Sequence, residues 1–93
     1  MKVNYPVIFT QSGSGYIAYI SDFDMYTQGS TLNEAVKMAK DELGILGIDY
    51  LDDNIEIPKP SNINDVKVSH PDDIVKLVDI DFEEYKKGLM QHN

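Results

Sequence analysis

Short runs of apolar side chains, separated by polar turns, occupy the first third of the chain. Residues 3–10, 16–20 and 26–29 each combine aromatic and β-branched side chains, a composition that predicts three strands. The Gly-containing connection at residues 11–15 is short enough to join the first two strands as a hairpin. Pro6 has no amide hydrogen, so we expect its part of the first strand to lie at a sheet edge or near the strand's start.

The pattern changes to helical spacing after Thr31. Thr31 and Glu34 form a capping box, in which the Thr oxygen accepts a hydrogen bond from a free amide of the first turn while the Glu side chain reaches back toward the N-terminal end of the helix. One apolar stripe then recurs at helical intervals: Leu32, Ala35, Val36, Ala39, Leu43 and Leu46. The stripe predicts a helix to about Tyr50. Gly44 and Gly47 each weaken it by up to ~1 kcal/mol relative to Ala, and they indicate either close packing against the sheet or a partner, or a frayed final turn.

Two prolines determine the conformation of the segment after the helix. Pro58 and Pro60 disfavour helix at and before their positions, so residues 55–60 must be extended. The elements expected next are one turn at 61–65, strands at 66–68 and 74–81 around a turn at 69–73, and a short helix at 82–89.

The order β-β-β-α-β predicts an α+β fold, an antiparallel three- to four-stranded sheet with one main helix packed on one face. The chain of 93 residues has room for one core only. We therefore expect a single domain over residues 1–93, with its core at about 1–81 and a short C-terminal helix or tail at 82–93.

Charge is unevenly distributed along the chain. Eight lysines and sixteen acids give a net charge of −8, and there is no Arg. Residues 1–40 are neutral, with three acids and three lysines, whereas residues 41–93 hold thirteen acids and five lysines. Nucleic-acid binding depends on cationic patches and Arg forks, so we expect no direct nucleic-acid binding. An acidic surface steers basic partners toward it, although acidity also serves solubility alone.

The residue types needed for most catalytic and metal sites are missing or badly spaced. No Cys is present, so disulfides, thiolate metal sites and Cys nucleophiles are excluded. His70 and His92 have no neighbour at metal-ligand spacing, and Gly13 and Gly15 are not followed by a helix, as a phosphate loop requires. We expect no catalytic, cofactor or metal site. The apolar runs are too short for a membrane span or a secretion signal, so the cytoplasm is the expected location.

Several short motifs stand in a fixed order along nearly the whole chain. They are Tyr5-Pro6, Gly15-Tyr16, Ile20-Ser-Asp-Phe-Asp24, Thr27-Gln-Gly-Ser-Thr-Leu-Asn-Glu-Ala35, Ile57-Pro-Lys-Pro-Ser61 and Val78-Asp-Ile-Asp-Phe-Glu-Glu-Tyr-Lys86. Together these motifs resemble the N-terminal domain of HicB-type antitoxins. The resemblance implies a partial ribonuclease-H-like fold and a non-catalytic role.

Domains of this family neutralise HicA, a small basic toxin that cleaves messenger RNA, by covering its RNA-binding face and catalytic histidine. The resemblance therefore implies a HicA-like partner, which the acidic second half of the chain suits. It also implies a homodimer or homotetramer, and an unpaired strand edge would allow such assembly by sheet extension.

Two segments form the predicted partner-binding surface. They are the loop and strand start Asp22, Phe23, Asp24, Met25 and Tyr26, and the acids Asp52, Asp53 and Glu56 after the helix. Phe23 and Met25 either plug the edge of the core or are exposed anchors for a partner. Both interpretations stay open at this point.

The chain departs from the family pattern in two places. Ser21 stands where the family commonly has proline, in a loop about one residue shorter. Relatives continue into a DNA-binding module, whereas this sequence stops at Asn93, where that module would begin. Two explanations stay open: the sequence is a shortened form of a longer protein, or the natural protein has no operator-binding module.

Two rival hypotheses remain. One is a stand-alone regulatory or scaffolding domain of the same fold that has no toxin partner. The other is a metal-dependent ribonuclease-H-like nuclease built on Asp22, Asp24 and Glu34. The second is disfavoured because both Asp residues lie in a loop and Glu34 is used better by the capping box.

Overall fold

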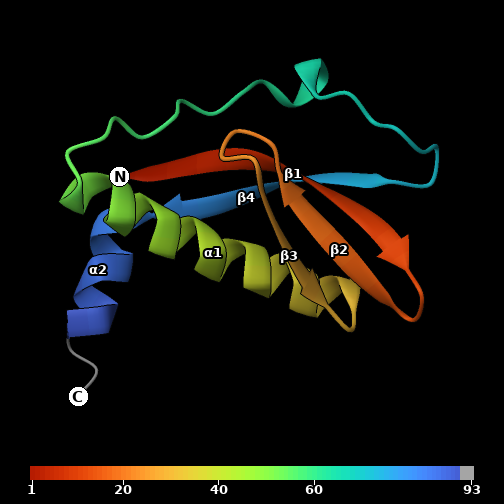
Figure 1. The fold of residues 1–93 in the computed structure, drawn as a ribbon, viewed down its shortest axis with the longest axis horizontal. Coiled ribbons are helices and arrows are strands. Elements are labelled where there is room, and N and C mark those ends of the chain that lie inside the picture. The colour runs from red at the N-terminus through yellow and green to blue at the C-terminus, as the bar shows by residue number, and fades with distance from the viewer. Residues whose placement is uncertain (91–93) are drawn as a thin grey trace.

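The computed structural model describes residues 1–90 and shows a four-stranded sheet with one long helix across one face (Figure 1). In chain order the elements are β1 (Lys2–Ser12), β2 (Gly15–Ile20), β3 (Met25–Gly29), α1 (Leu32–Asp52), the 3-10 turn η1 (Ile63–Asp65), β4 (Ile74–Asp81) and α2 (Phe82–Met90). The predicted α+β class is confirmed. Of the predicted tail, residues 91–93 lie outside the described part.

All strand pairs are antiparallel, in the order β3-β2-β1-β4, so the N-terminal strand lies inside the sheet. β1 pairs with β4 from Lys2 to Phe9, but with β2 only from Val7 onward. Pro6, opposite Leu77 of β4, therefore lies where β1 has a strand neighbour on one side only. This is the environment expected for a residue that has no amide hydrogen to donate.

The core lies between the sheet and α1. Alternate residues of β1 (Tyr5, Val7 and Phe9) point to the helix side, as the period of a strand requires. They pack with the following buried side chains of the other elements: Ala18, Ile20, Phe23, Ala35, Ala39, Leu43, Leu46, Val78 and Ile80. The predicted apolar stripe is thus the buried side of α1.

The start of α1 has the predicted cap. The Thr31 hydroxyl oxygen accepts from the Glu34 amide at 3.0 Å, and the Glu34 carboxylate accepts from the Ser30 amide at 2.8 Å. The Glu34 side chain thus reaches back to Ser30, the residue before the cap. These hydrogen bonds from Ser30 hold the pKa of Glu34 below its usual value.

Gly44 and Gly47 are the places on α1 where α2 packs. A Cβ on Gly44 would lie 2.6 Å from the Tyr85 ring, and one on Gly47 would overlap the Phe82 ring. Of the two interpretations of these glycines, the structure shows close packing, with α2 as the packing element. Since α1 continues to Asp52, its last turn is not frayed at Gly47.

The segment 53–73, which we call the strap, connects α1 to β4 along one long side of the molecule (Figure 1). The prediction of a strand at 66–68 is wrong. Val66 closes the η1 turn by donating its amide to the Ile63 carbonyl at 3.3 Å, and within residues 1–90 the only neighbour of β4 in the sheet is β1. None of the helices within residues 1–90 is long and apolar enough to cross a membrane.

Candidate partner-binding surface

The connection between β2 and β3 is a tight turn. The amides of Phe23 and Asp24 donate to the carbonyls of Ile20 and Ser21, both at 3.2 Å. Asp24 has a φ of 51°, in the left-handed region that Asp tolerates better than most residues. Its carboxylate accepts from the Tyr19 hydroxyl at 2.7 Å, and this hydrogen bond raises the pKa of Tyr19. The Asp24 carboxylate therefore has a local structural role.

Phe23 points into the core instead of outward. It is 8% exposed, and its ring packs edge-on against Tyr5 at 5.2 Å and Tyr50 at 5.5 Å between ring centroids. Edge-to-face aromatic pairs of this kind stabilise the fold beyond their buried area. Of the two interpretations of Phe23, the structure therefore shows the core plug.

Asp22 holds the strap. One carboxylate oxygen accepts from the Ser61 amide at 2.9 Å, and the other accepts from the Ser61 hydroxyl. The Tyr5 hydroxyl donates to the Pro58 carbonyl at 2.7 Å, a second attachment nearby. Burial, and next the charge of Asp22, raise the pKa of Tyr5 to about 12.

Met25 and Tyr26 are exposed at the start of β3, by 38% and 66%. The Tyr26 ring stacks on Tyr19 of β2 with 4.5 Å between centroids. Asp24, Met25 and Tyr26 are the exposed, mostly uncharged residues at this end of the hairpin, which we call the hairpin surface, although Met25 and Tyr26, consecutive in β3, point to opposite faces of the sheet. Tyr19 belongs to this surface too, and its position opposite Tyr26 in the register could not be derived from either strand alone.

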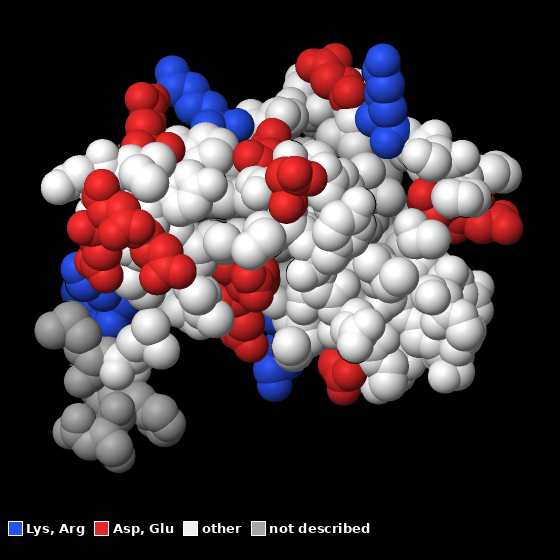
Figure 2. Space-filling view, viewed as in Figure 1, with Lys and Arg blue, Asp and Glu red and all other residues white. Residues whose placement is uncertain are grey.

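The predicted acids Asp52, Asp53 and Glu56 lie at the other end of α1, all exposed. With the exposed Asp49, one turn earlier, they form what we call the acidic end. The Asp53 amide donates to the Asp49 carbonyl at 3.0 Å, so helical hydrogen bonding continues into this stretch. Figure 2 shows a dense group of acidic side chains at the left, where α1 ends in Figure 1.

The acidic end is electrostatically unfavourable in the isolated chain. The last turn of α1 holds no basic residue, and negative charge at the C-terminus of a helix opposes the helix dipole by about 0.3–1 kcal/mol per charge. Leu51 and Ile55, in the same stretch of chain, are 50% and 52% exposed. The acidic end thus combines unneutralised charge with exposed apolar side chains. The sequence prediction missed Asp49, Leu51 and Ile55, although helical spacing placed Asp49 one turn from Asp52.

The structure thus divides the predicted site into two exposed surfaces, the half-buried Asp22 and the buried Phe23. Asp22 attaches the strap and Phe23 packs in the core. The remaining six residues lie on the hairpin surface or the acidic end.

The acids of the nuclease hypothesis are each engaged elsewhere. Asp22 is bonded to Ser61, Asp24 to Tyr19 and Glu34 to Ser30. Within residues 1–90, no group of three or more His, Asp and Glu side chains is placed to hold a metal ion. These acids do not form a two-metal site in this geometry.

A scan against protein-family models and a search of curated proteins both find no match to this chain. A search of solved structures finds a similar chain, described as "Toxin-Antitoxin complex from Streptococcus pneumoniae". The two chains are 29% identical with a TM-score of 0.79, over 91% of this chain and 73% of the other. The similarity therefore extends over nearly the whole described fold, and the other chain comes from a toxin–antitoxin complex.

Proposed function

We propose that this chain is a HicB-type antitoxin, which binds and neutralises a small basic HicA-like toxin that cleaves messenger RNA. The observation that carries the proposal is the similarity over 91% of the chain to a chain of a toxin–antitoxin complex. The ordered motifs from Tyr5-Pro6 to Val78–Lys86 supply the finer assignment to the HicB type.

The acidic end is the surface through which we propose that the toxin is bound. A basic partner placed there would neutralise Asp49, Asp52 and Asp53 and would relieve their conflict with the helix dipole. Leu51 and Ile55 supply apolar area that a purely ionic contact lacks. Charge would then determine the association rate and the choice of partner, and burial of apolar area would determine much of the affinity.

Inhibition in this proposal needs no chemistry by the chain. The antitoxin covers the RNA-binding face of the toxin, and a net charge of −8 keeps RNA away from the complex. A partner that cleaves messenger RNA would be met in the cytoplasm, where we place this function.

Calorimetric titration with the small basic protein encoded beside this chain, at low and high salt, tests the proposal. Binding is expected to be tight, to weaken with salt, and to stop RNA cleavage by that protein. The double variant Asp52→Asn/Asp53→Asn is expected to bind about tenfold more weakly. Asp65→Asn/Asp72→Asn removes the same charge from the strap and serves as the matched control.

The outcomes separate the hypotheses. Equal weakening by both double variants would show that overall charge, and not the acidic end, determines binding. No detectable heat at either salt, with both proteins folded, would contradict the antitoxin proposal and favour the stand-alone regulatory or scaffolding domain.

A further inference from the structure

One side of α1 packs on the sheet, and the side turned away from the sheet also carries apolar residues. The core residues Ala35, Ala39 and Leu43 recur at helical spacing on the sheet side. Met38 and Ile45 lie roughly a third of a turn around the helix from them, on one line, and are 41% and 46% exposed. A helix that covers one face of a sheet needs a single apolar side, so the core does not explain this exposed pair.

Exposed acids continue the line of Met38 and Ile45. Asp41, Asp49 and Asp52 follow at spacings of three or four residues, which place them on the same side of the helix. We call these five residues the outer stripe. Within residues 1–90, no ion pair reaches any of the three acids. The outer stripe therefore combines exposed apolar side chains with negative charge that the described part of the chain does not pair.

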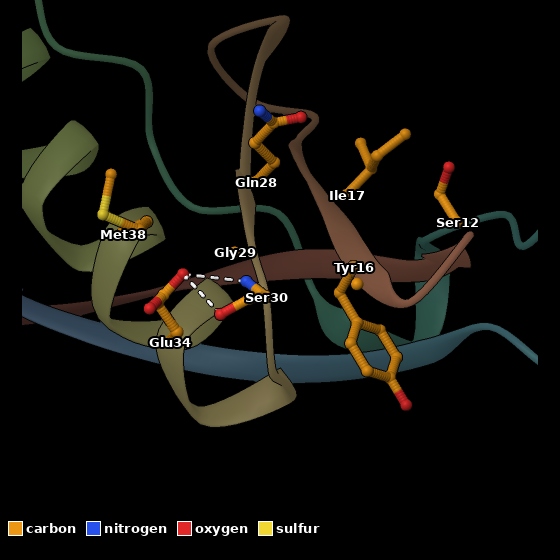
Figure 3. Close-up of a pocket in the computed structure, with 9 residues that line it drawn as sticks. Ser12, Tyr16, Ile17, Gln28, Gly29, Ser30, Glu34 and Met38 are labelled. Atoms are coloured by element: carbon orange, nitrogen blue, oxygen red, sulfur yellow. Dashed lines mark hydrogen bonds between the residues drawn. The ribbon is translucent and has the colours of Figure 1, made fainter.

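A hollow of about 500 Å³ opens beside the start of the outer stripe (Figure 3). Met38 borders it from α1, Gln28 borders it from β3, and Tyr16 borders it from β2. The Glu34 carboxylate, also on the α1 side, is turned back to Ser30, as the dashed lines show. The hollow therefore offers room beside Met38 for an apolar side chain of a partner.

An amphipathic helix is the element that this pattern fits. The outer stripe runs from Met38 to Asp52, which is about 21 Å of helix at about 1.5 Å per residue. A second helix laid along it would meet an apolar side chain or an acid at every turn, at the spacings of three and four residues through which helices pack. Lysines or arginines beside the apolar side of that helix would pair with the acids, whereas acidic residues there would be repelled.

We propose that the outer stripe is the docking surface for a basic amphipathic helix of a partner protein, laid lengthwise on α1 with one apolar side chain in the hollow beside Met38. The stripe meets the acidic end at Asp52 and extends it by about three turns toward the start of α1. Met38 and Ile45 contribute buried apolar area, and Asp41 and Asp49 select a basic helix. The identity of the partner as a toxin rests on the antitoxin proposal, whereas the surface itself does not.

Calorimetric titration of the whole chain with two kinds of ligand tests the proposal. One is the small basic protein encoded beside the chain. The other is a synthetic peptide of about 18 leucines and lysines, long enough to form a helix, with its leucines on one side. A permuted peptide of the same composition, with its leucines spread around the helix, is expected to bind at least about fivefold more weakly.

Variants of the outer stripe separate its apolar and acidic parts. Met38→Gln/Ile45→Gln keeps the charge and removes the apolar pair, and it is expected to raise the dissociation constants of the protein and of the first peptide about tenfold. Asp41→Asn/Asp49→Asn keeps the apolar pair and is expected to raise both constants about fivefold, with a weaker dependence on salt.

Two double variants away from α1 are the matched controls. Val68→Gln/Leu77→Gln removes apolar side chains that are 45% and 50% exposed, and Asp65→Asn/Asp72→Asn removes two exposed acids. Each is expected to change the dissociation constants by less than about twofold. Circular dichroism checks that every variant is folded.

The two ligands distinguish this proposal from the antitoxin proposal. Equal binding of the two peptides would overturn the docking surface, because net charge alone would then explain the affinity. Equal weakening by the stripe variants and their controls would overturn it too, and tight binding of the neighbouring protein in that case would leave the antitoxin proposal standing. Stripe-dependent binding of the first peptide, with no binding of the neighbouring protein, would support the docking surface and contradict the antitoxin proposal alone.

Discussion

Hydrogen bonds at two residues, Asp22 and Tyr5, attach the strap to the rest of the fold. Asp22 and Ser61 are 39 positions apart in sequence, and Tyr5 and Pro58 are 53 apart. Such bonds are formed only when the whole chain has folded, so they stabilise the native state without helping any local element to form. The strap offers few other attachments, because most of its side chains are exposed.

We expect Asp22→Ala to lower the free energy of unfolding by about 1–2 kcal/mol, since both bonds to Ser61 are lost. Urea unfolding measures the change, and hydrogen exchange of the Ser61 amide shows whether the strap is released. Asp72→Ala, which removes the same charge from an exposed turn, is expected to change stability by much less. Equal effects of the two variants would show that charge, and not the attachment of the strap, is responsible.

The residues of the predicted site differ in how far the sequence could predict them. The loop position of Asp22, Phe23 and Asp24 followed from local composition. Their roles depend on Ser61, Tyr50 and Tyr19, which the fold brings to them. A sequence shows that an aromatic residue stands in a polar loop, but it does not show on which side of that loop the core lies.

At the scale of elements, signals within one turn or one hairpin were sufficient. The capping box, the apolar stripe and the Gly-containing turn each involve residues close in sequence, and the predicted β1, β2, β3 and α1 are present. Residues 66–68 were mispredicted because a short apolar run has no strand structure without a partner, and among the described strands β4 pairs with β1 alone. In residues 66–68 the strand pairing of the folded chain therefore outweighs local β propensity.

The contact between α1 and α2 depends on two missing side chains. Gly47→Ala improves helix propensity by up to ~1 kcal/mol, yet its methyl group would overlap the Phe82 ring. Overpacking of this kind costs about 1–3 kcal/mol. We therefore expect a net loss of stability in urea unfolding, with faster hydrogen exchange throughout α2.

Gly88→Ala is the matched control, since no described atom lies within 4 Å of the position its Cβ would take. This substitution gains the same helix propensity without overlapping any neighbouring side chain, so stability is expected to rise slightly or stay unchanged. A rise at Gly47 as large as that at Gly88 would show that α2 is not fixed against α1.

At the scale of the whole molecule, charge separates the chain into two parts with different uses. The neutral half builds most of the sheet and ends at the uncharged β3 edge, and the acidic half supplies the end of α1, the strap, β4 and α2. Ion pairs offset little of this charge. Those within residues 1–90 gather mainly around Asp79 and Asp81, near the N-terminus, and they leave the acidic end unneutralised.

Salt should therefore affect the free chain and its complex in opposite directions. In the free chain, like charges repel across distances comparable to the Debye length of about 10 Å at 0.1 M salt, so added salt is expected to raise the midpoint of thermal unfolding by a few degrees. In the complex, the same screening removes attraction to a basic partner, and the dissociation constant is expected to rise. Thermal unfolding of the chain alone, measured in sodium and in potassium chloride to exclude ion-specific binding, checks the first expectation. A free chain destabilised by salt would mean that its few ion pairs outweigh the repulsion, and the acidic half would then be a structural feature with no need of a partner.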